Sequence, residues 1–367
     1  MRCAPFHESQ AADPIGSAGC YDGFLVVDVP LPWDREVTAA EPFRTMLDGP
    51  TSAALAADGS RWRPLARVPP TEAIAAGGSR ITEHCAVIES VRLDDGTAVD
   101  LRGPYRWRQW IVSSDDVMTF ARAMYGFGGP TGAAASAVAD TAAIDASPIG
   151  APSGGASDEQ GRGPDCVLVC THGRRDQCCG GPGTAMFEEL AHVFAESGAA
   201  VDAQRISHTG GHRFAPTAIT FPDGYAWAHL DATLVDRLVR RADPPARFAE
   251  HCRGSALFDG AAAQAADRAG LVVVGWEWAE VGRAMQLRAF DRLTMTTTVR
   301  AIARLADGSV RAFDVVSVPD RHIPLPTCGL VDGPEYTTEA VWRVLEVDEV
   351  EVGIVGAVEG PGWRESG

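Results

Sequence analysis

A long low-complexity stretch divides this chain and limits what it can fold into. Residues 128–163 read GGPTGAAASAVADTAAIDASPIGAPSGGASDEQGRG, which is rich in small residues, Gly and Pro and contains no aromatic residue. Such a segment buries too little apolar surface to offset the entropy of ordering, so we expect a flexible linker. The 367 residues suit two or three domains around it. We place an N-terminal domain at 1–127, the linker at 128–163, a central domain at 164–280 and a final segment at 281–367.

The N-terminal region has the pattern of an α+β domain. FLVVDVP at 24–30 predicts a strand, and HCAVIESVRL with DDGTAVDLRG predicts a hairpin closed by Asp95-Gly96. RWRQWIVS at 106–113 predicts another strand, and DDVMTFARAMYG predicts a helix that ends at Gly126. No set of catalytic residues stands out in this region.

The central region alternates strands and helices. CVLVC at 166–170 predicts a buried strand, and TAMFEELAHVFAES predicts a helix with Thr184 as N-cap and Gly198 as its stop. AVDAQRIS and APTAITFPDG predict two further strands, the second ending in a turn at Asp223-Gly224. DATLVDRLVRRA, capped by Asp231, and DGAAAQAADRAG predict two more helices. The order is typical of a small α/β sandwich such as thioredoxin, so we assign the chain to the α/β class.

The final segment, 281–367, has a mainly β pattern. LTMTTTVRAIARLADGSVRAFDVVSVP alternates and is rich in β-branched residues, which predicts an antiparallel hairpin with its turn at Asp307-Gly308. The acidic stretch LEVDEVEVGIVGAVE is also typical of strands, and we expect its charges to face solvent.

Three of the nine cysteines lie within ten positions, in CTHGRRDQCCGG, and two histidines follow in SHTGGHRFA. An odd number of cysteines argues against a disulfide framework and leaves packing, redox chemistry or metal binding. Both motifs follow predicted strands, and two glycines between the histidines allow a bend that turns both imidazoles to one site. We select as candidate metal ligands Cys170, Cys179, His208 and His212.

The spacing of the cysteines bears on the kind of metal. Structural zinc sites favour cysteines two to four residues apart, whereas eight residues separate Cys170 from Cys179. A [2Fe–2S] cluster is larger than one ion, and two His with two Cys is the ligand set of Rieske centres. The pattern therefore favours the cluster over zinc.

The other cysteines and histidines fit ordinary roles in the core or on the surface. We expect this of the histidines His172, His192 and His229 and of the cysteines Cys3, Cys20, Cys85, Cys252 and Cys328. Cys178 is undecided: it is a possible ligand in place of Cys179, half of a vicinal thiol pair, or a neighbour without a role.

At these residues the sequence resembles the sucrase/ferredoxin-like family. The matching stretches are CTHGRRDQCCG, HTGGHRFAPTAITFPDG, GSAGCYDGFLVVDVPLPW and CRGSALFDGAAAQAADRAG, which cover most of Cys20 to about Gly270. The resemblance implies a thioredoxin-like ferredoxin domain whose [2Fe–2S] cluster is held by Cys170, Cys179, His208 and His212. No pair of a nucleophile and an acid carboxylate supports a sucrase activity.

With such a cluster, the function is one-electron transfer. Neutral imidazoles donate less charge to iron than thiolates do, so we expect a reduction potential above that of all-Cys ferredoxins, and one that depends on pH. No dinucleotide-binding glycine motif accompanies the cluster, so we expect a separate redox partner protein and a carrier rather than a stand-alone enzyme. Three arginines flank the ligands, namely Arg174, Arg175 and Arg213. They either offset the charge of the cluster or bind an acidic redox partner, or they are solvated loop residues.

Two alternatives belong to other classes. The first is a thiol–disulfide redox enzyme on a thioredoxin-like scaffold, using Cys170 with Cys178 or Cys179. The second is a zinc-stabilised binding module with the same four ligands. The thiol enzyme leaves the two histidines without a function.

The net charge of −17 argues against nucleic acid or anionic membrane as a partner. No run of 18 apolar residues is long enough to span a membrane, and the first 20 residues lack the apolar core of a signal peptide. We therefore expect a cytoplasmic protein.

Overall fold

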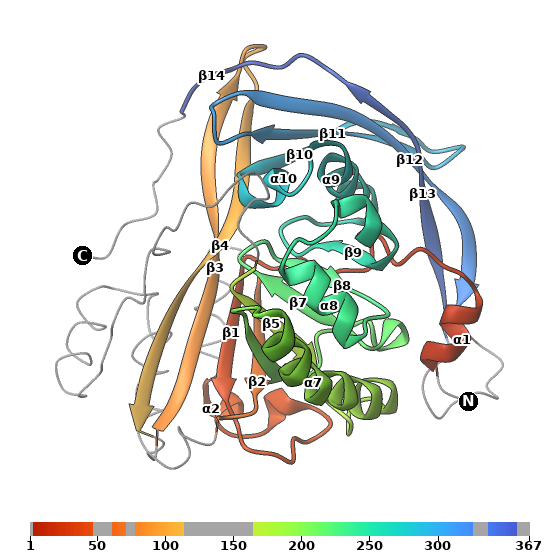
Figure 1. Ribbon diagram of the computed structural model, residues 1–367. Coiled ribbons are helices and arrows are strands. Elements are labelled where there is room, and N and C mark those ends of the chain that lie inside the picture. The colour runs from red at the N-terminus through yellow and green to blue at the C-terminus, as the bar shows by residue number, and fades with distance from the viewer. Residues whose placement is uncertain (1–2, 47–60, 71–77, 114–163, 326–336, 358–367) are drawn as a thin grey trace. The chain divides into compact units, whose positions relative to one another are not determined.

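The computed structural model describes residues 3–46, 61–70, 78–113, 164–325 and 337–357 (Figure 1). Three sequence predictions lie outside the described residues, namely the linker at 128–163, the helix that ends at Gly126 and the role of Cys328.

The described residues form an α/β structure with parallel and antiparallel strands, in agreement with the predicted class. Its helices are α1 (Cys3–Ser9), α2 (Phe43–Met46), α7 (Gln177–Ser197), α8 (Ala232–Val239), α9 (Ala261–Val274) and α10 (Glu277–Glu280). Its short 3-10 helices are η1 (Val37–Ala39), η2 (His212–Phe214) and η3 (Pro245–His251). In the part of the chain that is described, no helix is long and apolar enough to cross a membrane.

The chain divides into two compact units that do not follow its linear order. The first unit consists of Met1–Cys20, Ala86–Tyr105 and Asp158–Gly360. The second consists of Tyr21–Cys85, Arg106–Ser157 and Pro361–Gly367. The domain boundaries drawn from the sequence stay predictions.

The second unit is built around β1 (Gly23–Asp28), which is buried at every position. It pairs parallel with β2 (Trp62–Arg67) and antiparallel with the start of β3 (Gly78–Leu93). A strand that is buried on both faces is largely apolar, which is why FLVVDVP was recognisable as a strand. Its last residue, Asp28, forms a buried ion pair with Arg67 at 2.5 Å.

The predicted hairpin is formed by β3 and β4 (Ala98–Ser113), and Gly96 at its turn has a φ of 85°. One detail of the prediction was wrong: RWRQWIVS is the end of β4 and not a separate strand. Gly103 and Pro104 suggested a break, but the strand continues through both. Proline is tolerated in a strand where no ladder hydrogen bond needs its missing N–H.

A mixed sheet in the first unit positions the candidate ligands. Its strands, in spatial order, are β6 (Asp202–Ile206), β5 (Cys166–Cys170), β7 (Ala218–Phe221), β8 (Tyr225–Trp227) and β9 (Cys252–Ser255). The strands β5 and β6 are parallel and are joined through α7, while β7 is antiparallel to β5. The predicted turn between β7 and β8 is confirmed, since Gly224 has a φ of 71°.

Helix α7 begins earlier than predicted. Its N-cap is Asp176, whose Oδ1 accepts a hydrogen bond from the Cys178 amide at 2.9 Å, and not Thr184. The glycines after Cys179 have the composition of a loop, but they lie inside the helix. Gly180 and Gly183 allow the helix to pack closely on the backbone of Gly173 and Cys170. Its end at Gly198 is confirmed, with a φ of 74°. Cys178 and Cys179 therefore lie in the first helical turn.

An antiparallel group of four strands in the first unit confirms the β character of the C-terminal segment. It contains β10 (Arg283–Asp291), β11 (Thr296–Arg304), β12 (Val310–Pro324) and β13 (Thr338–Glu349), all antiparallel to their neighbours. The short β14 (Ile354–Ala357) pairs with β3. One hydrophobic core includes side chains of β5, β8 and β12, namely Val167, Trp227 and Phe313, together with Trp278 of α10.

Candidate metal centre

Two parallel strands bring the cysteine and histidine loops together. The last residue of β5, Cys170, pairs in register with Ile206 at the end of β6. The amide of Thr171 then donates a hydrogen bond to the carbonyl of Ile206 at 3.0 Å. Since parallel strands end at the same edge of a sheet, the loops that follow Cys170 and Ile206 begin side by side.

Cys179 reaches the same edge from the first turn of α7. Two glycines permit the close approach of this helix. A Cβ on Gly180 would lie 2.4 Å from the Cα of Gly173, and one on Gly183 would lie 2.3 Å from the carbonyl oxygen of Cys170. The glycine-rich sequence after Cys179 therefore holds the helix against the end of β5.

Cys170, Cys179 and His208 form one of two donor groups found among the described residues. Their sulfur and ring nitrogen atoms all lie within 4.8 Å of one another. Both cysteines are fully buried, and His208 is partly buried. Thiolate and imidazole are the ligands that zinc and iron–sulfur centres use, so this donor set fits either one.

The two buried thiols differ in acidity. A hydrogen bond from Cys179 holds the pKa of Cys170 well below its usual value, and His208 adds to this effect against the opposing effect of burial. The same hydrogen bond, together with burial, raises the pKa of Cys179. Of the two thiols, Cys170 therefore loses its proton more readily, and the thiolate is the form that binds metals.

His212 lies across a glycine bend from His208. Gly210 and Gly211 have φ values of 88° and 73°, in the left-handed region that glycine tolerates best. The ring centroids of the two histidines are 6.1 Å apart. The Nδ1 atom of His212 lies 2.7 Å from Oδ2 of Asp176. Three of the four predicted ligands thus form one group, and the fourth stands next to it with Nδ1 turned to a carboxylate.

The second donor group consists of Cys3, Asp176 and Cys178, all buried. The sulfur of Cys3 lies 3.3 Å from that of Cys178 and 3.0 Å from Nδ1 of His212. The structure therefore places Cys179, and not Cys178, beside Cys170. Cys3 is buried as predicted, but its polar contacts were missed, because nothing in the sequence connects residues 175 positions apart.

A buried cation, Arg253, adjoins the centre and was not singled out from the sequence. Its side chain donates to Oγ and the carbonyl oxygen of Ser17, at 3.1 and 2.6 Å, and to the carbonyl oxygen of Gly210 at 3.2 Å. All three acceptors are uncharged. Burial lowers the pKa of Arg253 to about 10, while Cys179 and Cys170 act in the opposite direction. Arg253 therefore stays protonated at neutral pH, with the two thiols and the carboxylate of Glu339 as sources of negative charge.

The arginines that flank the ligands have different surroundings. Arg213 forms an ion pair with Glu339, and its guanidinium carbon lies 4.4 Å from the centroid of the Phe214 ring. This arginine is therefore held in the structure and is not a solvated loop residue. Arg174 is exposed and Arg175 partly exposed.

The remaining histidines and described cysteines stand outside both donor groups. His172 is buried, His192 exposed and His229 partly buried. Cys252 is buried in the main core. These placements agree with the ordinary roles predicted for them.

Fold and donor set together define an α/β protein with a buried site of cysteines and histidines. The chain belongs to the sucrase/ferredoxin-like family, whose model matches residues 14–254, more than half of the chain. It is similar to Altered inheritance of mitochondria protein 32 of Debaryomyces hansenii, with 38% identity over 64 residues, which are 17% of this chain and 23% of the relative. The match thus spans less than a quarter of that relative's length. No solved structure matches this chain.

Proposed function

We propose that this protein binds one [2Fe–2S] cluster through Cys170, Cys179, His208 and His212 and carries single electrons. The observation that supports this most is the group of two thiols and one imidazole within 4.8 Å, with a second imidazole next to it. The ferredoxin-like description of the family points the same way. When bound, such a cluster supplies one-electron storage and transfer.

His212 would bind the metal through Nε2. Its Nδ1 atom faces Asp176 at 2.7 Å, which leaves Nε2 as the nitrogen for coordination. Metal-bound histidines commonly donate their other N–H to a carboxylate, which fixes the tautomer and the ring orientation. Asp176 would thereby hold His212 in position while its other carboxylate oxygen caps α7.

The proposal includes a thioredoxin-like arrangement of the ligand-bearing domain. Support comes from the parallel pair β5 and β6, joined through α7, followed by the antiparallel strands β7 and β8. In this arrangement both ligand loops leave the sheet at one edge.

A separate redox protein is the proposed partner, since the sequence carries no dinucleotide-binding motif that would supply electrons within the chain. We propose the cytoplasm as the compartment. In support, the eight described cysteines form no disulfide with one another, as is usual in reducing compartments.

A zinc-stabilised binding module is the second candidate. Donor atoms within 4.8 Å of one another also suit the small radius of a single ion. The thiol–disulfide enzyme has less support, because Cys170 and Cys179 are both 0% exposed, and a catalytic thiol needs access for its substrate.

Metal analysis of the full chain, purified without air, tests the proposal. We expect about two irons and two sulfides per chain and a visible absorption spectrum. His208→Ala should lose most of the iron, and the control His192→Ala, at an exposed histidine outside both donor groups, should keep it. One zinc per chain would support the binding module, and metal-free protein would contradict both metal proposals.

A further inference from the structure

Two cysteines from distant parts of the chain meet at the edge of the candidate metal centre. The sulfur atoms of Cys3, the first residue of α1, and Cys178, in the first turn of α7, lie 3.3 Å apart. Both side chains are 1% exposed. The same sulfur of Cys3 lies 3.0 Å from Nδ1 of His212, so α1 covers the histidine loop on this side.

The helix α1 is held in this place by several contacts. His7 Nε2 lies 2.9 Å from Oε1 of Glu339 in β13, and the His7 ring lies 4.5 Å from the ring of Phe214, nearly perpendicular to it. The amide of Ala4 donates to the sulfur of Cys178 at 3.4 Å. Cys3 is therefore brought to Cys178 by a defined packing of the helix.

The segment after α1 is anchored as well. Asp13 accepts two hydrogen bonds from the guanidinium of Arg268, at 2.6 and 2.7 Å. The amide of Gly16 donates to the carbonyl oxygen of Arg253 at 3.0 Å. The chain between these anchors and Cys3 is short, so the cysteine stays close to its partner.

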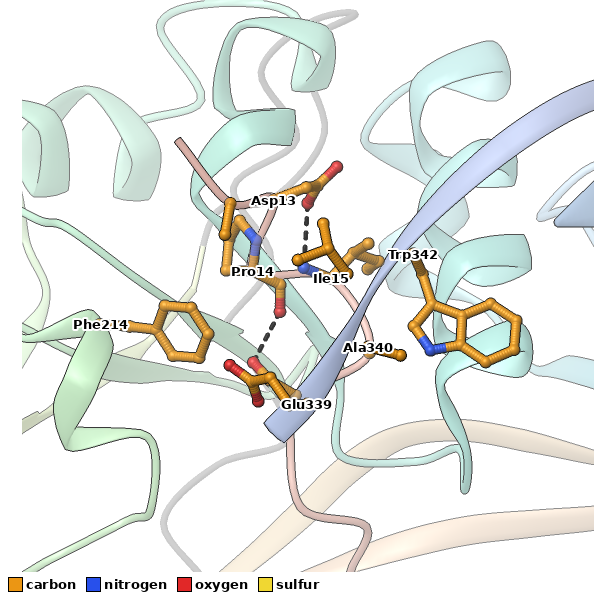
Figure 2. Close-up of a pocket in the computed structure, with 11 residues that line it drawn as sticks. Asp13, Pro14, Ile15, Phe214, Glu339, Ala340 and Trp342 are labelled. Carbon is orange, nitrogen blue, oxygen red and sulfur yellow. Dashed lines mark hydrogen bonds between the residues drawn. The ribbon is translucent and has the colours of Figure 1, made fainter. Parts of the chain in front are cut away.

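A cavity of about 210 Å³ gives this segment room to adjust. Figure 2 shows it between residues 12–17, Phe214 and residues 339–342. A disulfide bond measures about 2.05 Å, so the two sulfurs have to approach by roughly 1.2 Å.

The helix α1 and its contact with Glu339 lie outside the residues that match the family. The family model covers residues 14–254, which leaves out Cys3, His7 and Glu339. Cys178 alone of the thiol pair lies within the matched residues. The contact of α1 with the histidine loop thus involves residues that the family match does not cover, so its role is argued from this chain.

We propose that Cys3 and Cys178 form a reversible disulfide that locks α1 over His212. The oxidant is hydrogen peroxide, which is small enough to reach buried sulfurs. One thiolate attacks the peroxide to give a sulfenic acid and hydroxide, and the second thiolate attacks that sulfur, forms the S–S bond and releases another hydroxide. With the two thiol protons, the balance is two thiols and one peroxide giving one disulfide and two waters. A thiol reductant reverses the reaction by exchange.

Peptide mapping of the full chain tests the proposal. The protein is treated with stoichiometric peroxide, blocked with N-ethylmaleimide and digested without reduction. We expect the dominant cross-link to join the peptides that contain Cys3 and Cys178, and both residues to lose their maleimide label together. Dithiothreitol should restore both labels. Cys178→Ser measured beside Cys179→Ser assigns the second partner, since only the first should abolish the link.

Hydrogen exchange of residues 3–9 provides a second measurement, made on the wild-type chain and on two variants. Exchange in α1 should slow after peroxide and recover with dithiothreitol in the wild-type chain and in the control Cys20→Ser, but not change in Cys3→Ser. A Cys3 that keeps its label, or that links to another cysteine, would overturn the proposal. The iron content, measured on the same samples, separates this result from a failure of cluster binding.

Discussion

Arg253 brings a full positive charge into the interior beside two thiols. It is 2% exposed, and its hydrogen bonds go to neutral oxygens of Ser17 and Gly210. An uncompensated charge at such a depth is costly, so a negative partner within the site favours this arrangement. Gly211 has to be a glycine for the guanidinium to fit, because a Cβ there would lie 2.3 Å from one of its nitrogens.

Removing this charge should lower the reduction potential of the proposed cluster. Reduction adds one negative charge to the centre, and Arg253 stabilises that charge. For a representative separation of about 10 Å and an effective dielectric of about 20, a unit charge contributes roughly 1.7 kcal/mol, or about 70 mV for one electron. We expect Arg253→Met to lower the midpoint potential by roughly this amount in a redox titration. Arg253→Lys keeps the positive charge, so its midpoint potential should stay closer to that of the wild type. An unchanged potential in Arg253→Met would contradict the role given to this charge.

His84 in β3 makes the stability of the fold depend on pH. Burial, followed by the charge of Arg67, lowers the pKa of His84 to about 3. The folded chain keeps this imidazole neutral, whereas the unfolded chain takes up a proton below about pH 6.5, so stability falls as the pH drops from about 6.5 towards 3. Between pH 7.5 and 5 this amounts to about 2 kcal/mol of unfolding free energy.

Urea unfolding at the two pH values checks this contribution. In His84→Gln the loss of stability on acidification should be smaller than in the wild type by about 2 kcal/mol. The matched control is His192→Gln, at an exposed histidine, which should behave like the wild type. Equal pH dependence in His84→Gln and the wild type would show that this histidine is not held neutral by the fold.

At the level of single elements, α7 shows what sequence patterns reveal and what they miss. Its end at Gly198 was predicted, because a left-handed residue at a helix C-terminus strongly favours glycine. Its N-cap was predicted at Thr184, eight residues after the observed Asp176, since Gly180, Gly181 and Gly183 have the composition of a loop. These glycines are needed because the helix approaches β5 closely, and no local sequence pattern predicts this contact.

Two glycines of this helix give a matched pair of variants. Gly183→Ala would place its Cβ 2.3 Å from the carbonyl oxygen of Cys170, whereas a Cβ on the exposed Gly181 meets nothing within 4 Å. Gly183→Ala should lower the unfolding free energy by about 1–3 kcal/mol and reduce the metal content. Gly181→Ala should instead leave the metal unchanged and stabilise the chain by up to about 1 kcal/mol, since alanine favours helices. If Gly183→Ala and Gly181→Ala changed the unfolding free energy by similar amounts in urea, this result would contradict the close packing at Cys170.

Over the whole molecule, the sequence was most informative where the signal is local. The turns at Gly96 and Gly308 and the cap Asp231 depend on neighbouring residues and were predicted. Strands with a clear apolar pattern, such as β1 and β5, were predicted as well, whereas the short strands β2, β8 and β9 and the cap Asp176 were missed. The cysteine and histidine motifs were recognisable because each is compact and follows a strand.

Contacts between distant segments were not predictable. Cys3 meets Cys178 across 175 positions, and Glu339 reaches His7 across 332. No periodicity or motif spacing in the sequence connects the members of such a pair, so the contact is seen only in the folded chain. The same is true of Arg253. Its sequence context does not distinguish it from the other arginines, whereas its burial in the structure does.

Pulsed EPR of the dithionite-reduced full chain tests most directly whether two cysteines and two histidines hold an iron–sulfur cluster. A cluster with histidine ligands should give an S = 1/2 signal with couplings to imidazole nitrogen, and the coupling pattern should lose one nitrogen in His212→Cys and stay unchanged in His192→Ala. A reduced cluster without nitrogen couplings, or a chain without iron, would contradict the ligand set of Cys170, Cys179, His208 and His212.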